Sequence, residues 1–298
     1  MSNTSASLRR QIDSAVDLQS VVRTMKALAA SGIGQYEASV RALTDYYRSV
    51  ELGLGACFRD SEPARREFEA RPAGRPGAIC VVLFGSDQGL VGQFNEVLTD
   101  YAVHALTTLS RPAQVWAVGE RVYARLADAG WPPKGLLAVP HSVRGIAPLV
   151  GQILIDTEMA EHESIELREL HLFYNRPGSA ASYEPVGLRL LPLDRGWCRQ
   201  LTHQAWPTNQ LPQVAGRTHA VLRALIGEYL FICLFRACAE SLASENASRL
   251  AAMERADKNI DELLGTLHGS YNRLRQSGID EELFDVIAGF EALGGSPH

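Results

Sequence analysis

Apolar residues recur at steps of three and four along residues 5–54 of the chain. Side chains at these spacings lie on the same face of an α-helix, so the pattern predicts one long N-terminal helix. The apolar face is narrow, as in a coiled-coil seam, and lacks the width of a helix that covers a globular core. The predicted seam consists of Leu8, Ile12, Ala15, Leu18, Val22, Met25, Ala29, Ile33, Tyr36, Val40, Leu43, Tyr47, Val50 and Leu54.

The same spacing returns at residue 218 and continues to about residue 292. One helix of roughly 75 residues would span on the order of 110 Å. Long helices of this kind gain most of their stability by packing, so we expect the two seams to pair, in antiparallel orientation. Because the N-terminal helix is shorter, roughly the last third of the C-terminal helix is expected to lack a helical partner from this chain. The absence of proline from residues 1–62 and 213–296 supports both helices, because proline disrupts the interior of a helix.

The middle of the chain, residues 75–212, has a different pattern. Short apolar runs at 78–84, 113–118, 136–139 and 169–174 alternate with helical stretches near 93–109, 120–129 and 146–161. This alternation predicts a small, Rossmann-like, mostly parallel α/β domain, with residues 186–192 as an edge strand. Residues 55–75 and 195–215 are expected to be linkers or loops. The expected domains are a helix at 1–58, a globular α/β base at 75–212 and a helix at 213–293.

Composition narrows the function. With 46% hydrophobic and 21% charged residues the chain is an ordinary globular protein, and its net charge of −5 argues against nucleic-acid binding. The five cysteines form no Cys-x-x-Cys pair, which favours a reducing compartment over a disulfide scaffold or a zinc site. The most apolar segment, residues 230–235, is much shorter than the roughly 20 residues of a membrane span.

One local motif follows the first predicted strand and opens a helix: Gly85-Ser-Asp-Gln-Gly-Leu-Val-Gly-Gln-Phe-Asn95. A glycine-rich turn at a helix N-terminus can cradle a phosphate. This turn, however, matches neither Gly-x-Gly-x-x-Gly nor a P-loop, and it contains no cation. We therefore favour a structural turn, with Gly89 and Gly92 at special backbone angles.

Catalytic chemistry is not indicated elsewhere. No two of the eight histidines stand three or four residues apart, as a metal site on a helix would need, and His171 is expected to be a satisfied or edge histidine. No Gly-x-Ser-x-Gly elbow occurs. We predict no catalytic residue, no cofactor and no metal.

Three ordered segments resemble a known family. The helix Ile12-Asp-Ser-Ala-Val-Asp-Leu-Gln-Ser-Val-Val-Arg-Thr-Met-Lys-Ala-Leu-Ala-Ala-Ser31 is similar to the N-terminal helix of F-type ATP synthase gamma subunits. The turn signature of that family resembles Ser86, Asp87, Gly89, Gly92 and Asn95. The family's C-terminal block is similar to Glu245-Asn-Ala-Ser-Arg-Leu-Ala-Ala-Met253, to residues 271–276 and to residues 279–289. The chain is thus identified as a divergent bacterial member.

This resemblance implies a rotor that is itself not catalytic. The helix pair would turn inside a hexamer of alpha and beta subunits, coupling ion flow to ATP synthesis or hydrolysis. The α/β base would sit on the membrane c-ring, at the cytoplasmic face of the bacterial inner membrane, and the epsilon subunit would be a further partner of the chain. By the same resemblance, the residues that contact partners and transmit torque are Met25, Lys26, Arg275, Gln276, Glu282 and Asp285.

The chain departs from the family at several positions. Gly32 and Gly34 stand where basic residues are usual, and Gln88 and Val91 replace a basic residue and a cysteine in the turn. Two other functions remain open: a soluble nucleotide-binding enzyme that uses the turn at residues 85–95, and a coiled-coil adaptor that does not rotate.

Overall fold

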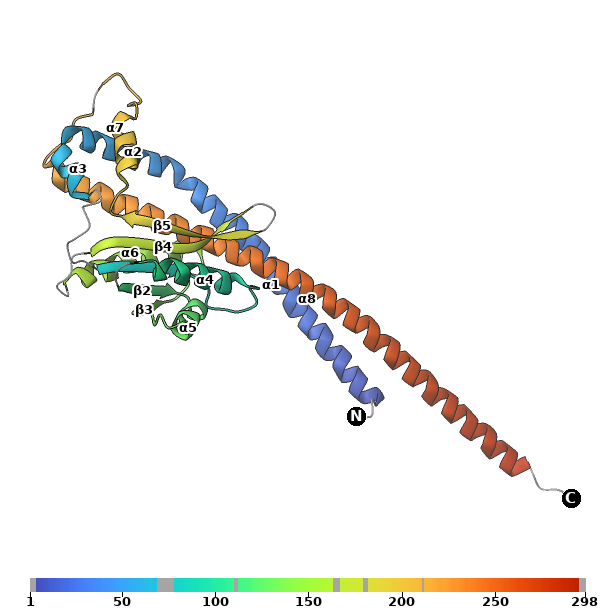
Figure 1. Ribbon diagram of the computed structural model, residues 1–298. Coiled ribbons are helices and arrows are strands. Elements are labelled where there is room, and N and C mark those ends of the chain that lie inside the picture. Colours follow the sequence, from blue (N-terminus) through green and yellow to red (C-terminus); the bar gives the residue numbers. More distant parts are fainter. Residues whose placement is uncertain are drawn as a thin grey trace. The chain divides into compact units, whose positions relative to one another are not determined.

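A computed structural model describes residues 4–68, 78–109, 112–162, 167–178, 182–210 and 212–294. The chain divides into two compact units. The first comprises Met1–Leu28 and Leu250–His298, and the second comprises Ala29–Arg249. Figure 1 shows the elements with their labels. The expected three-domain division stays a prediction.

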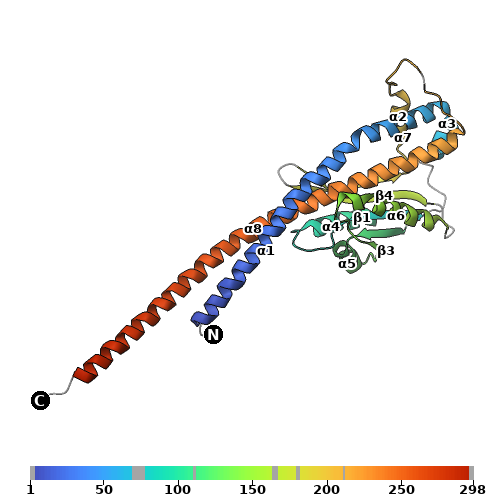
Figure 2. The same ribbon diagram turned by 180° about the vertical axis from the view of Figure 1, so that it is seen from behind.

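The first unit contains parts of two long helices, α1 (Ser5–Ala42) and α8 (Thr218–Gly294). Their pairing is antiparallel, because Gln19 bonds to Asp261 while Lys26, further along α1, contacts Asp257. The opposite course of the two helices can be followed in Figure 2. The long C-terminal helix and the antiparallel pairing are confirmed.

One position of the predicted seam is wrong. Leu18 is 55% exposed, whereas its neighbour Gln19 is only 8% exposed. Alternating steps of four and three from Leu8 reach position 19. The prediction departs from this period at Leu18 because Leu18 is apolar and Gln19 is not. Val22 occupies the next seam position and forms a small apolar cluster with Met253 and Ile260.

The N-terminal helix also breaks earlier than predicted. It ends at Ala42, and after a turn at Leu43 the chain continues as α2 (Thr44–Asp60) and α3 (Glu62–Phe68). A further helix, α7 (Arg195–His203), lies where a loop was expected. The side chain of Asp194 caps α7 by accepting a hydrogen bond from the backbone N–H of Trp197 at 2.8 Å. The sequence does not predict α3 because it has few apolar residues, or α7 because it follows the last predicted strand, outside the alternation of strands and helices.

The second unit is built on a five-stranded sheet with the order β3-β2-β1-β4-β5. The first four strands are parallel, and β5 runs antiparallel to β4 at the edge, as predicted. The strands are β1 (Ala78–Phe84), β2 (Ala113–Val118), β3 (Gly135–Leu137), β4 (Leu167–Pro177) and β5 (Tyr183–Leu191). The fold class is confirmed as α/β with a mostly parallel sheet.

Helices cover both faces of this sheet (Figure 1). On one face, Ile79, Val81 and Leu83 of β1 pack against α4 (Phe94–Thr107) and α5 (Glu120–Asp128). On the other face, alternate residues of β1 join a larger core with α6 (Val143–His162) and the part of α8 before residue 250. Because β1 is buried on both faces, its sequence is a continuous apolar run.

Candidate functional site

The strand-turn signature after β1 forms a closed hydrogen-bond network. Asn95 accepts from the backbone N–H of Ser86 at 3.0 Å, and its Nδ2 donates to Ser86 Oγ at 2.8 Å. The Ser86 hydroxyl in turn donates to the carbonyl of Gln88 at 2.9 Å. Ser86 and Asn95 are both buried. These two residues therefore fix the conformation of the turn.

Asp87 ties the turn to the neighbouring loops. Its Oδ1 accepts from the backbone N–H of Glu120, at the start of α5, at 3.0 Å. Its Oδ2 accepts from the backbone N–H of Val139, which follows β3, at 2.9 Å. A phosphate bound at this edge of the sheet would need such amide donors, and here the chain's own carboxylate already occupies them. The geometry favours the structural interpretation of the turn over nucleotide binding.

The glycines of the turn have different roles. Gly92 has φ +58°, in the left-handed region, as predicted. For Gly89 the prediction is wrong, since the other left-handed residue of this turn is Leu90, with φ 63°. Ser248 of α8 donates to the carbonyl of Val91 at 2.5 Å, and a Cβ on Gly92 would lie 3.4 Å from its hydroxyl. Gly92 thus permits a close approach of the turn to α8.

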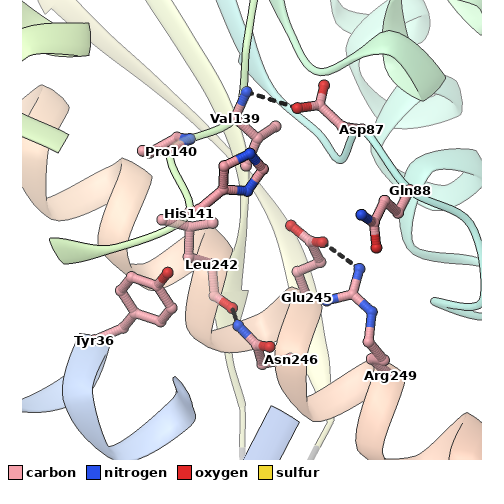
Figure 3. A pocket seen from close by; sticks show the side chains of 10 residues that line it. All are labelled: Tyr36, Asp87, Gln88, Val139, Pro140, His141, Leu242, Glu245, Asn246 and Arg249. Atoms are coloured by element: carbon pink, nitrogen blue, oxygen red, sulfur yellow. Dashed lines mark hydrogen bonds and ion pairs between the residues drawn. The ribbon is translucent and has the colours of Figure 1, made fainter. Parts of the chain in front are cut away.

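A polar pocket of about 150 Å³ lies within the second unit, beside this turn (Figure 3). It is formed where α1, α8 and the loops after β1 and β3 meet. Its lining residues are Tyr36, Asp87, Gln88, Val139, Pro140, His141, Leu242, Glu245, Asn246 and Arg249.

Glu245 is the most buried charged residue of this pocket, at 5% exposure. Its Oε1 accepts from Arg249 at 2.5 Å, whereas its Oε2 has no partner among the described residues. Burial raises the pKa of this carboxyl, and the charge of Arg249 opposes that shift. The nearby Asp87 raises the pKa further, while His141 lowers it.

The sequence indicated only part of this pocket. Glu245 and Arg249 lie within a segment that resembles the family, whereas Tyr36 belongs to the predicted helix seam and His141 is one of the scattered histidines. The available signal was a pair of opposite charges four residues apart on α8, in a stretch that is otherwise apolar or small. The burial of these residues and their proximity to one another become visible only in the folded structure.

The six predicted partner-contact residues belong to the first unit, whereas the turn signature belongs to the second. Met25 is partly buried against the cluster around Val22, and Lys26 lies 3.5 Å from Asp257. Along α8, the remaining four have exposed side chains: Arg275, Gln276, Glu282 and Asp285.

The other groups singled out by sequence are structural. The ring of His171 lies 2.9 Å from Glu169, so His171 is a satisfied histidine. It is not an edge histidine, because β4 lies between β1 and β5. Within the described ranges there is no group of three His, Cys, Asp or Glu side chains that could hold a metal ion. No described helix is both long and apolar enough to cross a membrane.

Comparison with solved structures supports the fold. A chain of the mitochondrial ATP synthase of Euglena gracilis superposes with a TM-score of 0.62 at 17% identity, covering 98% of this chain and 96% of the other. A chain from the central stalk and c-ring structure of the Tetrahymena thermophila enzyme gives a TM-score of 0.57 at 21% identity. That match covers 79% of this chain and 99% of the other.

Sequence comparison extends over the whole chain. The ATP synthase gamma chain of Moorella thermoacetica is 29% identical, over 96% of this chain and 98% of the relative. The gamma chain of Sorangium cellulosum is 28% identical with the same coverage. The family model described as ATP synthase matches residues 4–293. The resemblance found in the three sequence segments is thereby confirmed, and the chain belongs to the ATP synthase family.

Proposed function

We propose that this chain is the central-stalk rotor of an ATP synthase, a gamma chain like its relatives. It would couple ion flow through a membrane c-ring to ATP synthesis or hydrolysis by an alpha and beta hexamer. The epsilon subunit would be a further partner, and the complex would sit at the cytoplasmic face of a bacterial inner membrane. In this function the chain binds and moves its partners, and supplies no catalytic group.

The observation that carries this proposal is the exposed C-terminal part of α8. Every residue from 272 to 289 is exposed except Gly278, which is partly buried. Many of these residues are large and apolar, and such exposed stretches mark protein contact sites. The apolar residues are Leu274, Ile279, Leu283, Phe284, Val286 and Ile287.

Four polar residues of the same segment are the proposed contacts with the beta subunits. Arg275, Gln276, Glu282 and Asp285 are exposed and available for hydrogen bonds across an interface. Met25 and Lys26 would act differently. Since Lys26 is engaged by Asp257 at 3.5 Å, its part in torque transfer would be to stiffen the helix pair.

Co-purification tests the proposal. A tagged full-length chain should be recovered from its own organism with two nucleotide-binding subunits, in three copies each. Recovery without such subunits would instead support the non-rotary adaptor.

Single substitutions then test the contacts. Arg275→Ala should lower ATP hydrolysis by the purified complex several-fold, because an exposed guanidinium at an interface is often energetically dominant. Lys258→Ala, at another exposed basic residue of α8, is the control and should have little effect. Equal activity of the two variants would exclude Arg275 as a contact that transmits torque.

A further inference from the structure

The pocket beside the turn contains hydrogen-bonding capacity that the described chain leaves unused. Among the described residues, the buried acceptor Glu245 Oε2 and the buried donor Arg249 Nε have no hydrogen-bond partner. Asn246 donates through Nδ2 to the carbonyl of Leu242 at 2.8 Å, which leaves its Oδ1 as an acceptor at the pocket wall. Figure 3 shows the Glu245 carboxylate and the Tyr36 hydroxyl directed toward the space around His141. A buried carboxylate oxygen without a partner costs free energy, so a donor at this position would stabilise the fold.

The charges of the lining residues favour a cation. Asp87 and Glu245 are acidic and Arg249 is basic, so these three groups, when ionised, carry one net negative charge. An anion would meet two carboxylates, and the backbone amides of Glu120 and Val139 that could have bound it are already engaged by Asp87.

The donor set favours a nitrogen cation over a metal ion. The described residues offer no group of three metal-binding side chains. A divalent ion at Glu245 would also be repelled by Arg249, whose guanidinium is fixed 2.5 Å from the same carboxylate. An ammonium or guanidinium group carries a single charge and directional N–H donors that match separate acceptor oxygens.

The volume of the pocket and the residues of its walls also fit an ammonium or guanidinium group. Water occupies about 30 Å³ per molecule, so the cavity of about 150 Å³ has room for a cationic group with a few carbon atoms. Tyr36 and His141 contribute ring surfaces to the walls, and an aromatic face such as that of Tyr36 attracts such a cation.

We propose that this pocket binds an ammonium or guanidinium group, with Glu245 Oε2 and Asn246 Oδ1 as its acceptors. The group belongs either to a small free amine or to a lysine or arginine side chain of a partner subunit. None of the residues that form this site is among the six proposed partner contacts, which all lie in the first unit.

The primary test is a titration of the full-length chain with methylguanidinium chloride, followed by nitrogen-15 NMR at constant ionic strength. The amide signals of Gln88 and His141 should move in a saturable manner. N-methylurea has the same shape without the charge and should produce no saturable shift.

Two variants identify the acceptors. Glu245→Gln keeps the shape of the side chain but removes its charge, and should weaken methylguanidinium binding at least tenfold. Glu254→Gln, on the exposed face of the same helix, should bind as the unmodified chain does. If Glu245→Gln does not fold, Asn246→Ala provides the test, with a several-fold loss expected.

Two results would overturn the proposal. One is the absence of saturable binding, which would mean that the cavity holds only water. The other is binding that Glu245→Gln leaves unchanged.

A fluorine label on Gln88→Cys distinguishes the two sources of the cation. If the labelled chain within the purified complex still responds to methylguanidinium, the natural ligand is a free amine. If the isolated chain responds and the complex already shows the bound signal, a partner's basic side chain fills the pocket.

Discussion

The carboxylate of Asp87 accepts a hydrogen bond from the backbone N–H of Val139 at 2.9 Å and so joins the loops that follow β1 and β3. Its second oxygen accepts from Glu120 at the first turn of α5. One side chain therefore holds together three segments that lie far apart in sequence. This is a structural reason for a carboxylate in the turn, one that does not require a bound nucleotide.

Asp87→Ala should accordingly lower the free energy of unfolding by about 2 kcal/mol, because two backbone amides lose their acceptor. Urea denaturation of the full-length chain measures this loss. Asp100→Ala, an exposed aspartate of α4, is the control and should change the free energy by less than about 0.5 kcal/mol. Equal effects of both substitutions would contradict the structural role of Asp87.

Asp257 should make the helix pair sensitive to acid. Its partial burial raises its pKa, but the hydrogen bonds and charges of Arg23 and Lys26 outweigh this effect, so the pKa lies below the ordinary value. A carboxyl with a depressed pKa in the folded state stabilises the fold above its unfolded pKa of about 3.9, and this stabilisation is lost as pH falls through the folded pKa.

Asp257→Asn should therefore unfold at a lower temperature than the parent chain at neutral pH, and the difference should shrink below about pH 4. Circular dichroism at a series of pH values measures it. Asp280→Asn, at an exposed position of α8, should show no such convergence.

The contribution of Glu245 to the stability of the fold should have the opposite pH dependence. Its pKa is raised, mainly by burial, so its contribution to stability is complete below the unfolded pKa of about 4.3 and is lost as pH rises through the folded pKa. The groups facing it are Tyr36 from α1, Asp87 after β1, His141 before α6 and Arg249 on α8.

Glu245→Gln removes this titration, so the variant should gain stability relative to the parent as pH rises from about 4. The slope of the difference is at most about 1.4 kcal/mol per pH unit for one proton. Urea denaturation over this range measures it. A constant difference between the two chains would show that Glu245 titrates normally in the folded state.

Gly34 and Gly32 provide a matched pair within α1. A Cβ on Gly34 would meet no atom within 4 Å, so Gly34→Ala should stabilise the chain by about 1 kcal/mol through helix propensity alone. A Cβ on Gly32 would lie 3.3 Å from the side chain of Asn246, which reduces or cancels that gain. Thermal unfolding of the two variants should rank Gly34→Ala above Gly32→Ala, and the reverse order would contradict the packing around Asn246.

The regular parts of the fold could be predicted from sequence because they have a clear period or a continuous apolar run. The strands at 78–84 and 113–118 were predicted with the bounds that the structure shows, and α8 was predicted within two residues of its end. The sequence does not predict α3, whose apolar side chains are few, or α7, which is as long as the predicted α5 but does not stand between two predicted strands. The choice of Leu18 over Gln19 failed because hydrophobicity alone does not reveal when a buried amide has carboxylate partners.

The two candidate sites also differ in how far the sequence predicts them. The turn signature could be recognised because its residues are adjacent in sequence. The pocket combines Tyr36, His141 and Glu245 from distant segments, and only the packing of α1 and α8 against one face of the sheet brings them together. The raised pKa of Glu245 likewise depends on burial, which no local pattern of charges predicts.

The amide of Gln19 fixes the alignment of the helix pair. It donates to Asp261 at 2.5 Å and to Asp257 at 3.3 Å, two carboxylates one turn apart on α8. A sliding of α1 by one heptad would keep the apolar seam in contact but would place this amide opposite Leu264 and His268, or opposite Leu250 and Glu254. In either case Gln19 would lose one or both of its carboxylate partners. The apolar seam alone fits several alignments, but only the observed alignment satisfies the buried amide of Gln19.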